Sequence, residues 1–261
     1  MSKVILSVVI ATCDRHIKLD NCITSLYKIF AREGFENYAE IIVIDQSNSR
    51  FILGAKYDTK NNYTYLHSHI RNAAHARNLG ALKAQGKYLW FLDDDAEVIS
   101  MNFDSLLTNK GVIFISWRER NSIYTSTRRL RKVNILRMSG TPFYIIRNDI
   151  FWSVCGFCEE LGPGSTIGGG EDLDLLLRID KLFYINDFVI QGQISHPINQ
   201  PEPIKHRVYY HARGYVLGKN KEFLLFLINL LYDTLLFYRH GTIRVVLLIR
   251  GFMYGLRKTA Y

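Results

Sequence analysis

Three consecutive carboxylates, Asp93-Asp94-Asp95, follow directly on the apolar run Tyr88-Leu89-Trp90-Phe91-Leu92. An apolar run of this length, bounded by a break signal, is typical of a fully buried strand. Three adjacent like charges at its carboxyl end repel one another and destabilise the fold unless a positive charge lies beside them. A divalent cation with oxygen ligands would supply that charge. A solvated acidic turn after the strand is the alternative.

A second acidic group follows a glycine-rich segment. Residues 161–170 contain five glycines and lead into Glu171-Asp172-Leu173-Asp174. Glycines followed by acids and an apolar run predict a helix start, with the acids in the first turn, where the helix dipole favours them. Glu171 and Asp172 could then be caps only. Flexible glycines beside them indicate instead that the backbone closely approaches a ligand.

The elements that must position these acids alternate between strands and helices. Apolar runs predict strands over 3–11, 41–44, 63–67 and 88–92, and helical spacing predicts helices over 17–31 and 72–83. This order implies a mostly parallel sheet covered by helices on both faces. Ligands bind such sheets beyond the carboxyl ends of the strands. Polar breaks at three of these ends should therefore converge on one cleft: Asp14-Arg15, Asp45-Gln46-Ser47 and Asp93–Asp95.

The second half of the chain is less regular. Short strands are predicted over 112–117 and 142–146. Between them, residues 118–137 hold seven Lys/Arg and one Glu. We expect an exposed loop or ribbon near the cleft there, with a solvated face as its simplest interpretation.

Composition and charge exclude some protein classes. Apolar residues make up 48% of the 261 residues, enough for a sizeable core and too many for global disorder. The net charge of +9 is uneven, because residues 205–261 hold 10 Lys/Arg and only 2 Asp/Glu. That asymmetry indicates an anionic surface partner, either lipid headgroups or nucleic acid.

The four cysteines include Cys155 and Cys158, which have the spacing of a CxxC motif. Zinc or redox chemistry would need a second CxxC, a His pair or a thioredoxin-like setting, and the sequence has none of these. We therefore expect buried, reduced thiols in a cytosolic protein. The N-terminal apolar run is short, only Lys3 precedes it, and no small-residue cleavage site follows, so no signal peptide is expected.

The last part of the chain predicts two apolar helices. Residues 222–238 are nearly all apolar, but the run is short for a membrane span and has Asp233 near its middle. Residues 242–258 combine apolar and basic positions. Such helices are expected to lie in a membrane interface. A helical hairpin packed on the rest of the chain or on a dimer partner is the alternative.

Five segments, in this order, resemble the family 2 glycosyltransferases of GT-A fold. Each motif is weak by itself, but the ordered set is specific, and the resemblance covers roughly residues 4 to 200. Cys13-Asp14 departs from the family's usual Tyr-Asn and leaves the base preference open. The segments are Ser7–Arg15 (the opening strand and its "T-Y-N-R" end), Ile42–Ser47 ("V-V-D-x-S"), Ala76–Gly80 ("A-R-N-x-G"), Gly86–Asp95 ("G-x-Y-x-x-F-L-D-x-D") and Gly164–Arg178 ("G-G-E-D-x-D-L-x-x-R").

The resemblance implies an α/β fold of the GT-A, Rossmann-like kind. Residues 1–204 would form the glycosyltransferase domain, with a nucleotide-sugar-binding half over 1–98 and an acceptor half over 99–204. Residues 205–261 would be a basic, amphipathic helical tail that associates with an anionic membrane surface through 222–258.

The resemblance also implies a donor site. Asp95 is the expected direct metal ligand, Asp93 faces the metal or the ribose, and Mg²⁺ or Mn²⁺ suits these oxygen ligands. Asp94, between them, is expected to be a spacer within the donor site. His196 would contact the metal or the diphosphate, with a structural histidine as the alternative. The remaining donor-binding residues would be Thr12, Asp14, Arg15, Asp45, which would read the base, and Arg77, for which a helix-surface charge is the alternative.

On the acceptor side, the resemblance makes Asp172 the catalytic base, and a carboxylate can accept the proton of an acceptor hydroxyl. Glu171 would position the acceptor, and Asp174 would face back into the fold. One base implies a single displacement with inversion. The basic residues of 118–137 would hold a pyrophosphate-linked acceptor.

Together these features predict a metal-dependent, inverting glycosyltransferase. It would move a sugar from a nucleotide-sugar donor, a UDP-sugar, to a glycan or lipid-linked acceptor in bacterial surface polysaccharide synthesis. It would be cytoplasmic, peripheral on the inner face of the cell membrane, with a homodimer as an option and no nucleic-acid partner.

Two other classes remain as alternatives. A metal-dependent nucleotidyltransferase would show a glycine-rich loop after the first strand, and Thr12–Arg15 has no glycine. A non-enzymatic membrane- or nucleic-acid-binding module would explain the basic tail but not the three acids at a cleft; salt-dependent nucleic-acid binding would favour it.

Overall fold

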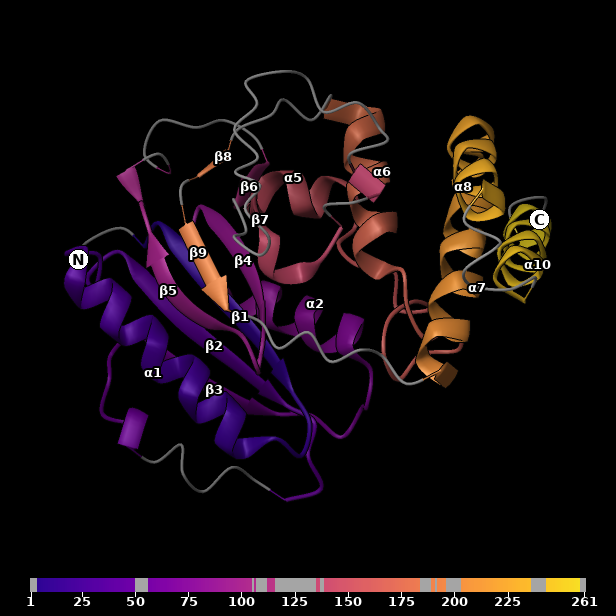
Figure 1. The fold of residues 1–261 in the computed structure, drawn as a ribbon. Coiled ribbons are helices and arrows are strands. Elements are labelled where there is room, and N and C mark those ends of the chain that lie inside the picture. Colours follow the sequence, from indigo (N-terminus) through magenta and orange to yellow (C-terminus); the bar gives the residue numbers. More distant parts are fainter. Residues whose placement is uncertain are drawn as a thin grey trace.

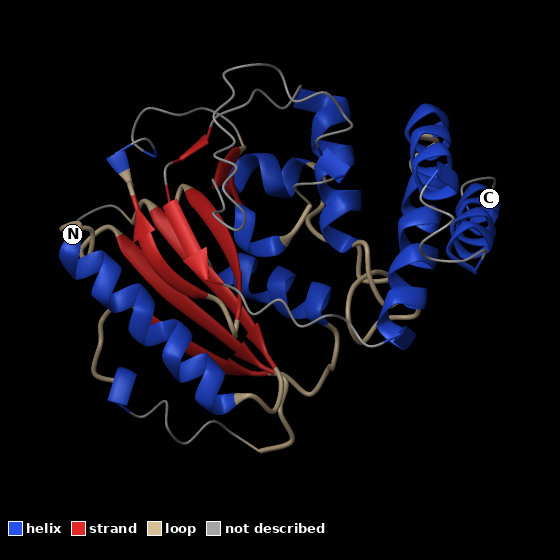
Figure 2. Ribbon diagram, in the orientation of Figure 1, coloured by secondary structure: helices blue, strands red, loops and turns tan. Residues whose placement is uncertain are grey.

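The structure, a computed structural model, describes residues 4–49, 56–104, 106, 112–115, 135–136, 139–183, 189–190, 192–195, 203–235 and 243–258. A seven-stranded sheet in the order β3-β2-β1-β4-β7-β6-β8 forms its centre, with helices on both faces. Three further helices stand beside this layered body (Figure 1). Figure 2 shows the same arrangement with the strands in red and the helices in blue. The α/β fold predicted from the sequence is confirmed.

The parallel half of the sheet brings the polar strand ends together. Thr12 lies opposite Asp45, and Ala11 lies opposite Asp93 in the strand register. The parallel strands are β1 (Leu6–Thr12), β2 (Ala39–Asp45), β3 (Tyr63–His67) and β4 (Tyr88–Asp93). The sheet continues through β7 (Tyr144–Arg147), which is antiparallel to both β4 and β6 (Ile113–Ile115), and ends with β8 (Val189–Ile190), which is parallel to β6.

Alternate side chains of β1 enter two different core clusters. Val8 and Ile10 pack in the cluster that contains the apolar face of α1 (His16–Arg32). Val9 faces the other cluster, which contains residues of α2 (Ala73–Lys83), α5 (Asn148–Ser153) and α6 (Glu171–Phe183). This alternation follows from the period-two pleat of a strand that is covered on both faces.

Gly80, the glycine of the A-R-N-x-G segment, lies where α2 packs on β1. A Cβ atom added at this position would lie 2.3 Å from Cγ1 of Val9. The absence of a side chain therefore lets α2 lie directly on β1, at the strand whose end carries Thr12.

A small antiparallel sheet and a single helical turn complete the site's surroundings. β5 (Glu97–Met101) continues the chain after the three aspartates and pairs with β9 (Gly192–Ser195). The turn η2 (Thr141–Phe143) leads into β7.

The chain ends in three helices: α7 (Pro203–Lys219), α8 (Phe223–Leu235) and α10 (Ile243–Lys258). α7 and α10 run parallel and in close contact, since Gly214 lies against Leu248 and Gly218 against Phe252. A Cβ atom at Gly214 or Gly218 would lie 2.1 Å from a backbone oxygen of α10. The paired G-x-x-x-G spacings, 214/218 and 251/255, therefore permit this packing.

The helices predicted over 222–238 and 242–258 are confirmed as α8 and α10. Of the strand expected over 112–117, Ile113–Ile115 is a strand, and residues 116–117 lie outside the described residues. The basic segment 118–137 also lies outside them, apart from Ile135 and Leu136. Within the described part of the chain, no helix is both long and apolar enough to span a bilayer.

The expectation of buried thiols is wrong for three of the four cysteines. All four are free, but only Cys22 is buried; Cys13 and Cys158 are partly exposed, and Cys155 is exposed. Cys155 has a positive φ of 61° and lies in the surface turn that follows α5. Cys13 follows the end of β1 and lines a surface pocket, and Cys155 and Cys158 lie in the connection between α5 and α6, so none of the three belongs to a strand or helix of the core.

Candidate active site

A pocket of about 1100 Å³ opens at the carboxyl ends of β1 and β4. Its strand side includes Thr12, Arg15, Asp93 and Asp95. Its opposite side consists of the glycine-rich loop, the start of α6 and one face of α7. The lining residues discussed below are Thr12, Arg15, Arg71, Arg77, Asp93, Asp95, Thr141, Gly164, Gly168, Gly169, Gly170, Glu171, Asp172, Val208, Tyr209 and Arg213.

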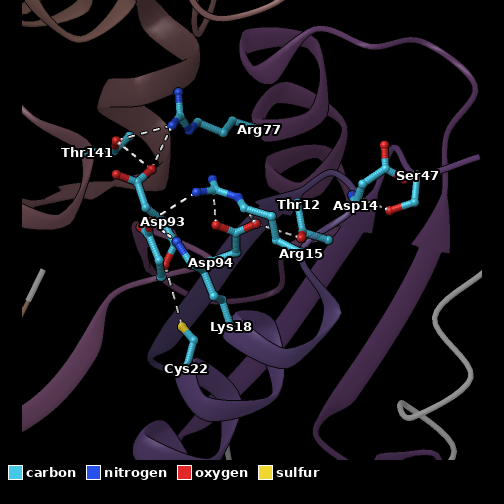
Figure 3. Close-up of polar contacts among 11 residues, drawn as sticks. Thr12, Asp14, Arg15, Lys18, Cys22, Ser47, Arg77, Asp93, Asp94 and Thr141 are labelled. Atoms are coloured by element: carbon cyan, nitrogen blue, oxygen red, sulfur yellow. Dashed lines mark hydrogen bonds and ion pairs between the residues drawn. The ribbon is translucent and has the colours of Figure 1, made fainter. Parts of the chain in front are cut away.

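The two outer aspartates of the triple are each paired with cations of the chain. Figure 3 shows Asp93 beside Arg77 and Thr141. Asp93 Oδ1 accepts from Arg77 Nη2 at 3.0 Å and from the hydroxyl of Thr141 at 3.1 Å. Asp95 Oδ2 lies 3.0 Å from Arg15 Nη1 and 3.4 Å from Lys18 Nζ. The repulsion anticipated from the sequence is thus offset in part by arginine and lysine side chains.

Asp94 is fully buried, and its expected role as a spacer within the donor site stays a prediction. Its carboxylate accepts from the Thr12 hydroxyl at 2.7 Å and lies 2.7 Å from Arg15 Nη2. Burial raises the pKa of Asp94 to about 6, against the opposing effects of Thr12 and Arg15. Its side chain does not line the pocket, so it acts on the site by positioning Thr12 and Arg15.

Arg77 joins the two sides of the pocket. It is 5% exposed, and besides Asp93 it contacts Glu171, whose Oε1 accepts from Nη1 at 2.9 Å. Burial opposes its charge, but Asp93 and Glu171 outweigh burial and hold the pKa of Arg77 above its ordinary value. The alternative that Arg77 is a helix-surface charge is therefore excluded.

Asp172 lies at the start of α6 and lines the pocket. The buried hydroxyl of Tyr144 donates to its Oδ1 at 2.5 Å. Burial, followed by the neighbouring charge of Glu171, raises the pKa of Asp172 to about 7, while Arg77 and Tyr144 lower it. A carboxylate that titrates near neutrality is suited to take a proton at physiological pH.

Asp174 faces back into the fold, as predicted. It is fully buried and bonded to Arg178 at 2.8 Å, Asn220 at 2.9 Å and Lys219 at 3.3 Å. These contacts connect the first turn of α6 to the end of α7.

Asp14 and Asp45 lie near the pocket, but their side chains do not line it. Asp45 is fully buried and accepts from Tyr65 at 2.6 Å and from the Ser47 hydroxyl at 2.5 Å. Asp14 accepts from Arg71 Nη2 at 2.8 Å. Their donor-binding roles stay predictions.

The carboxylates of the strand side fit a hard divalent cation. Asp93 and Asp95 offer oxygen ligands, which Mg²⁺ and Mn²⁺ prefer. Among the described residues, no three His, Cys, Asp or Glu side chains are grouped to hold a metal unaided. Mg²⁺ is commonly bound by one or two carboxylates together with substrate phosphates, so two carboxylates suffice for such a site. His196 lies outside the described residues.

The glycine-rich loop was expected to approach a ligand closely, and the structure shows that its glycines closely approach other parts of the chain. A Cβ atom at Gly164 would lie 2.2 Å from the backbone oxygen of Arg71, and one at Gly168 would lie 2.7 Å from Val208 of α7. Both glycines have a positive φ, 84° and 80°. The glycines therefore seat α7 against the start of α6, where it also lines the pocket.

Sequence reasoning missed four residues of the site: Thr141, Tyr144, Tyr209 and Arg213. Thr141 begins η2 and Tyr144 begins β7, in a region where only a short strand over 142–146 was predicted. Tyr209 and Arg213 lie on α7, within the segment interpreted as a tail. The paired G-x-x-x-G spacings were a signal that α7 belongs to a packed helix pair.

Comparisons with known proteins bear on the family and the fold of the chain. The sequence model described as glycosyl transferase family 2 matches residues 7–154. No curated protein sequence matches the chain.

Several solved structures share the fold. Staphylococcus aureus TarS has a TM-score of 0.62 and 16% identity, covering 91% of this chain and 44% of that one. TarS 1-349 in complex with UDP-GlcNAc has a TM-score of 0.56 and 16% identity, covering 81% and 65%. The mannosyltransferase PcManGT from Pyrobaculum calidifontis, in complex with GDP-Man and Mn²⁺, has a TM-score of 0.55 and 14% identity, covering 98% and 74%.

Proposed function

Because the chain belongs to glycosyl transferase family 2 and is therefore a glycosyltransferase, we propose that it uses a UDP-sugar as donor and inverts the anomeric carbon. The acceptor is a hydroxyl of a glycan or of a lipid-linked sugar, in surface polysaccharide synthesis. One observation carries the proposal: Asp172, with a pKa of about 7, lines the same pocket as Asp93 and Asp95, and Arg77 links the two sides.

The strand side is suited to a donor diphosphate. Asp93 and Asp95 would hold Mg²⁺ or Mn²⁺, which would stabilise the negative charge that builds on the leaving nucleoside diphosphate. Arg15, which pairs with Asp94 and Asp95, lines the pocket and offers a further cation to the phosphates. The UDP-GlcNAc in TarS and the GDP-Man and Mn²⁺ in PcManGT support a metal-bound nucleotide sugar as donor.

The helix side supplies the base. Asp172, as the ionised carboxylate, accepts the proton of the acceptor hydroxyl as the oxygen attacks the anomeric carbon. Tyr144 donates to Asp172 and thereby fixes which way the carboxylate points. With one base and direct attack, a single displacement inverts the configuration.

The helices α8 and α10 support a peripheral position on an anionic membrane, at the inner face of the cell membrane. α8 exposes Leu224 by 71%, Leu227 by 52% and Leu231 by 62%. α10 adds exposed Arg250 and Arg257. Apolar side chains beside basic ones suit an interface with anionic headgroups.

Co-sedimentation with vesicles tests this position. Phosphatidylglycerol vesicles should bind the chain, phosphatidylcholine vesicles should bind it weakly, and Leu227→Asp should lower binding to both. Equal binding to both vesicle types would contradict a preference for anionic membranes. A dimer in light scattering that Leu227→Asp disrupts would instead indicate that α8 faces a protein partner.

A panel of nucleotide sugars tests the proposed donor. UDP-GlcNAc, UDP-glucose, UDP-galactose and GDP-mannose are each incubated with Mn²⁺, with Mg²⁺ or with a chelator, and nucleoside diphosphate release is measured. We expect metal-dependent release from a UDP-sugar, and its loss in Asp95→Ala. Asp149→Asn is the matched control, because Asp149 forms its ion pair with Arg147. In the strand register, Arg147 lies opposite Tyr88, at the end of β4 away from Asp93 and the pocket. The proposal would be overturned if none of the donors showed metal-dependent release of its nucleoside diphosphate.

A further inference from the structure

Arg213, on the face of α7 that lines the pocket, differs from the other pocket arginines in its ion-pair partners. Four basic residues line the pocket among those described: Arg15, Arg71, Arg77 and Arg213. The first three are paired with Asp94 and Asp95, with Asp14, and with Asp93 and Glu171, respectively. Within the described part of the chain, no carboxylate lies within ion-pair distance of Arg213; its one hydrogen bond is from Nη1 to Asn229 Oδ1, at 3.5 Å.

That contact does not account for the arginine by itself. At 3.5 Å, the bond to the neutral Asn229 side chain is at the limit of hydrogen-bond length, and Asn229 also donates to Leu225 O at 2.8 Å within α8. A guanidinium has five donors in a planar fork that matches a phosphate. Most of the donors of Arg213 are therefore available to a ligand in the pocket.

Tyr209 lies one helical turn before Arg213, so the two side chains share a face of α7. Its ring rests on Gly169, whose added Cβ would lie 3.1 Å from Cδ1, and the residue is 46% exposed. Tyr209 lines the pocket, and burial, followed by the charges of Glu171 and Asp93, raises its pKa. The lack of a side chain at Gly169 lets the ring closely approach the loop that leads into α6.

We infer that Tyr209 and Arg213 form the acceptor subsite, in which Arg213 binds the phosphate of a phosphate-linked sugar and Tyr209 packs against the sugar ring. The inference rests on the proposed glycosyltransferase function and narrows its acceptor to phosphate-bearing glycans. The location supports an acceptor rather than the donor, because both side chains lie on α7, which packs on the glycine-rich loop that leads directly into Glu171 and Asp172. The same α7 packs against α10, so a phosphate with a lipid tail would lie beside the helices proposed to face the membrane.

Equilibrium binding tests the subsite without requiring catalysis. The probes are dodecyl-diphospho-N-acetylglucosamine and dodecyl N-acetylglucosaminide, which has no diphosphate, each titrated calorimetrically into the full chain in detergent. The wild type should bind the diphospho probe ~10- to 100-fold more tightly than the neutral probe, as expected for charge-assisted bonds to phosphate. Arg213→Ala should abolish that preference, and Arg213→Lys should keep part of it. Tyr209→Ala should weaken both probes by ~5-fold or more.

Matched controls lie on the same helix. Arg207 is exposed and Tyr210 contacts Arg244, and neither lines the pocket. Arg207→Ala and Tyr210→Ala should leave the affinities of both probes unchanged, and thermal melting of each variant checks folding. The UDP-sugars are also titrated into the wild type and into each variant, to measure whether the substitutions change donor affinity.

The outcomes separate the two claims. Equal affinity of the wild type for the two probes, or a preference that survives Arg213→Ala in a folded variant, would overturn the subsite. Weaker UDP-sugar binding in Arg213→Ala, with unchanged binding of the diphospho probe, would assign the arginine to the donor and also overturn it. Absence of any nucleotide-sugar binding by the wild type would instead count against the proposed function, while the preference for the diphospho probe could still be measured.

Discussion

On the strand side of the pocket, Asp93 and Asp95 each lie beside cations of the chain, whereas on the helix side Asp172 has a pKa near neutrality and Arg213 has no acidic partner among the described residues. The strand side is held by parallel pairing of β1 with β2 and β4. The helix side depends on loop glycines and on packing between helices. The comparison indicates a strand side with its charges largely balanced and a helix side with reactive and binding groups left open.

The strongest test of this comparison removes the base. Asp172→Asn should lower the rate of sugar transfer by roughly 10²- to 10⁴-fold, the range for loss of a general base, because the amide cannot take the acceptor proton. Nucleotide-sugar affinity, set by the strand side, should change little. Steady-state kinetics and donor calorimetry, with Asp149→Asn as control, measure both quantities. A folded Asp172→Asn variant with full transfer activity would refute the division of roles.

The second test breaks the link between the sides. Arg77→Met leaves Asp93 and Glu171 without their shared cation, and removal of one partner from a buried ion pair costs about 3–5 kcal/mol. We expect a loss of that order in the free energy of unfolding, measured by urea denaturation. Arg32→Met is the control, since Arg32 is about half exposed and pairs only with Glu33 among the described carboxylates. A loss below about 1 kcal/mol would mean that the two carboxylates rearrange freely.

The third test loosens the helix side only. A Cβ at Gly214 would lie 2.1 Å from the Leu248 backbone oxygen, so Gly214→Ala must push α7 and α10 apart. Overpacking of this kind costs about 1–3 kcal/mol. The free energy of unfolding should fall by that amount, while UDP-sugar affinity stays unchanged. Thr234→Leu, which adds bulk at an exposed position of α8, is the control. A weakened donor affinity in Gly214→Ala would show that the strand side also depends on α7.

The strand side could be predicted from the sequence because its residues follow contiguous apolar runs. A parallel sheet brings the ends of such runs together, so Thr12, Arg15, Asp93 and Asp95 were placed correctly at one cleft. The contacts of Asp94 could not be predicted, because sequence spacing does not reveal that its side chain turns inward to Thr12 and Arg15.

The helix side could be predicted only in part. Glu171 and Asp172 stand out by their glycine-rich context, but Tyr209 and Arg213 lie about 40 residues further on, in a helix whose basic composition suggested a separate tail. Their place in the pocket depends on the approach of α7 to Gly168, Gly169 and Gly170, a tertiary contact that no local pattern specifies. The division of the chain at residue 204 stays a prediction.

The smallest expected effect concerns pH. Asp172 must be ionised to act as base, so the transfer rate should rise as the pH increases through about 7. Tyr144 donates to the carboxylate and favours its charged form, so Tyr144→Phe should move this limb of the pH–rate profile to higher pH by about one unit, the value of one such hydrogen bond. The pKa of Asp172 is higher in the folded protein than its ordinary value of 3.8. Its stabilising contribution is therefore present at low pH and is lost as the pH rises through about 7.

Tyr27→Phe is the control for this profile, because Tyr27 lies on α1 and donates to Asn62, away from the pocket. A limb that stays in place in Tyr144→Phe would identify another titrating group. Asp94, with a pKa of about 6, is the candidate on the strand side. The midpoint of the limb and its response to Tyr144→Phe therefore decide which side of the pocket sets the pH dependence of transfer.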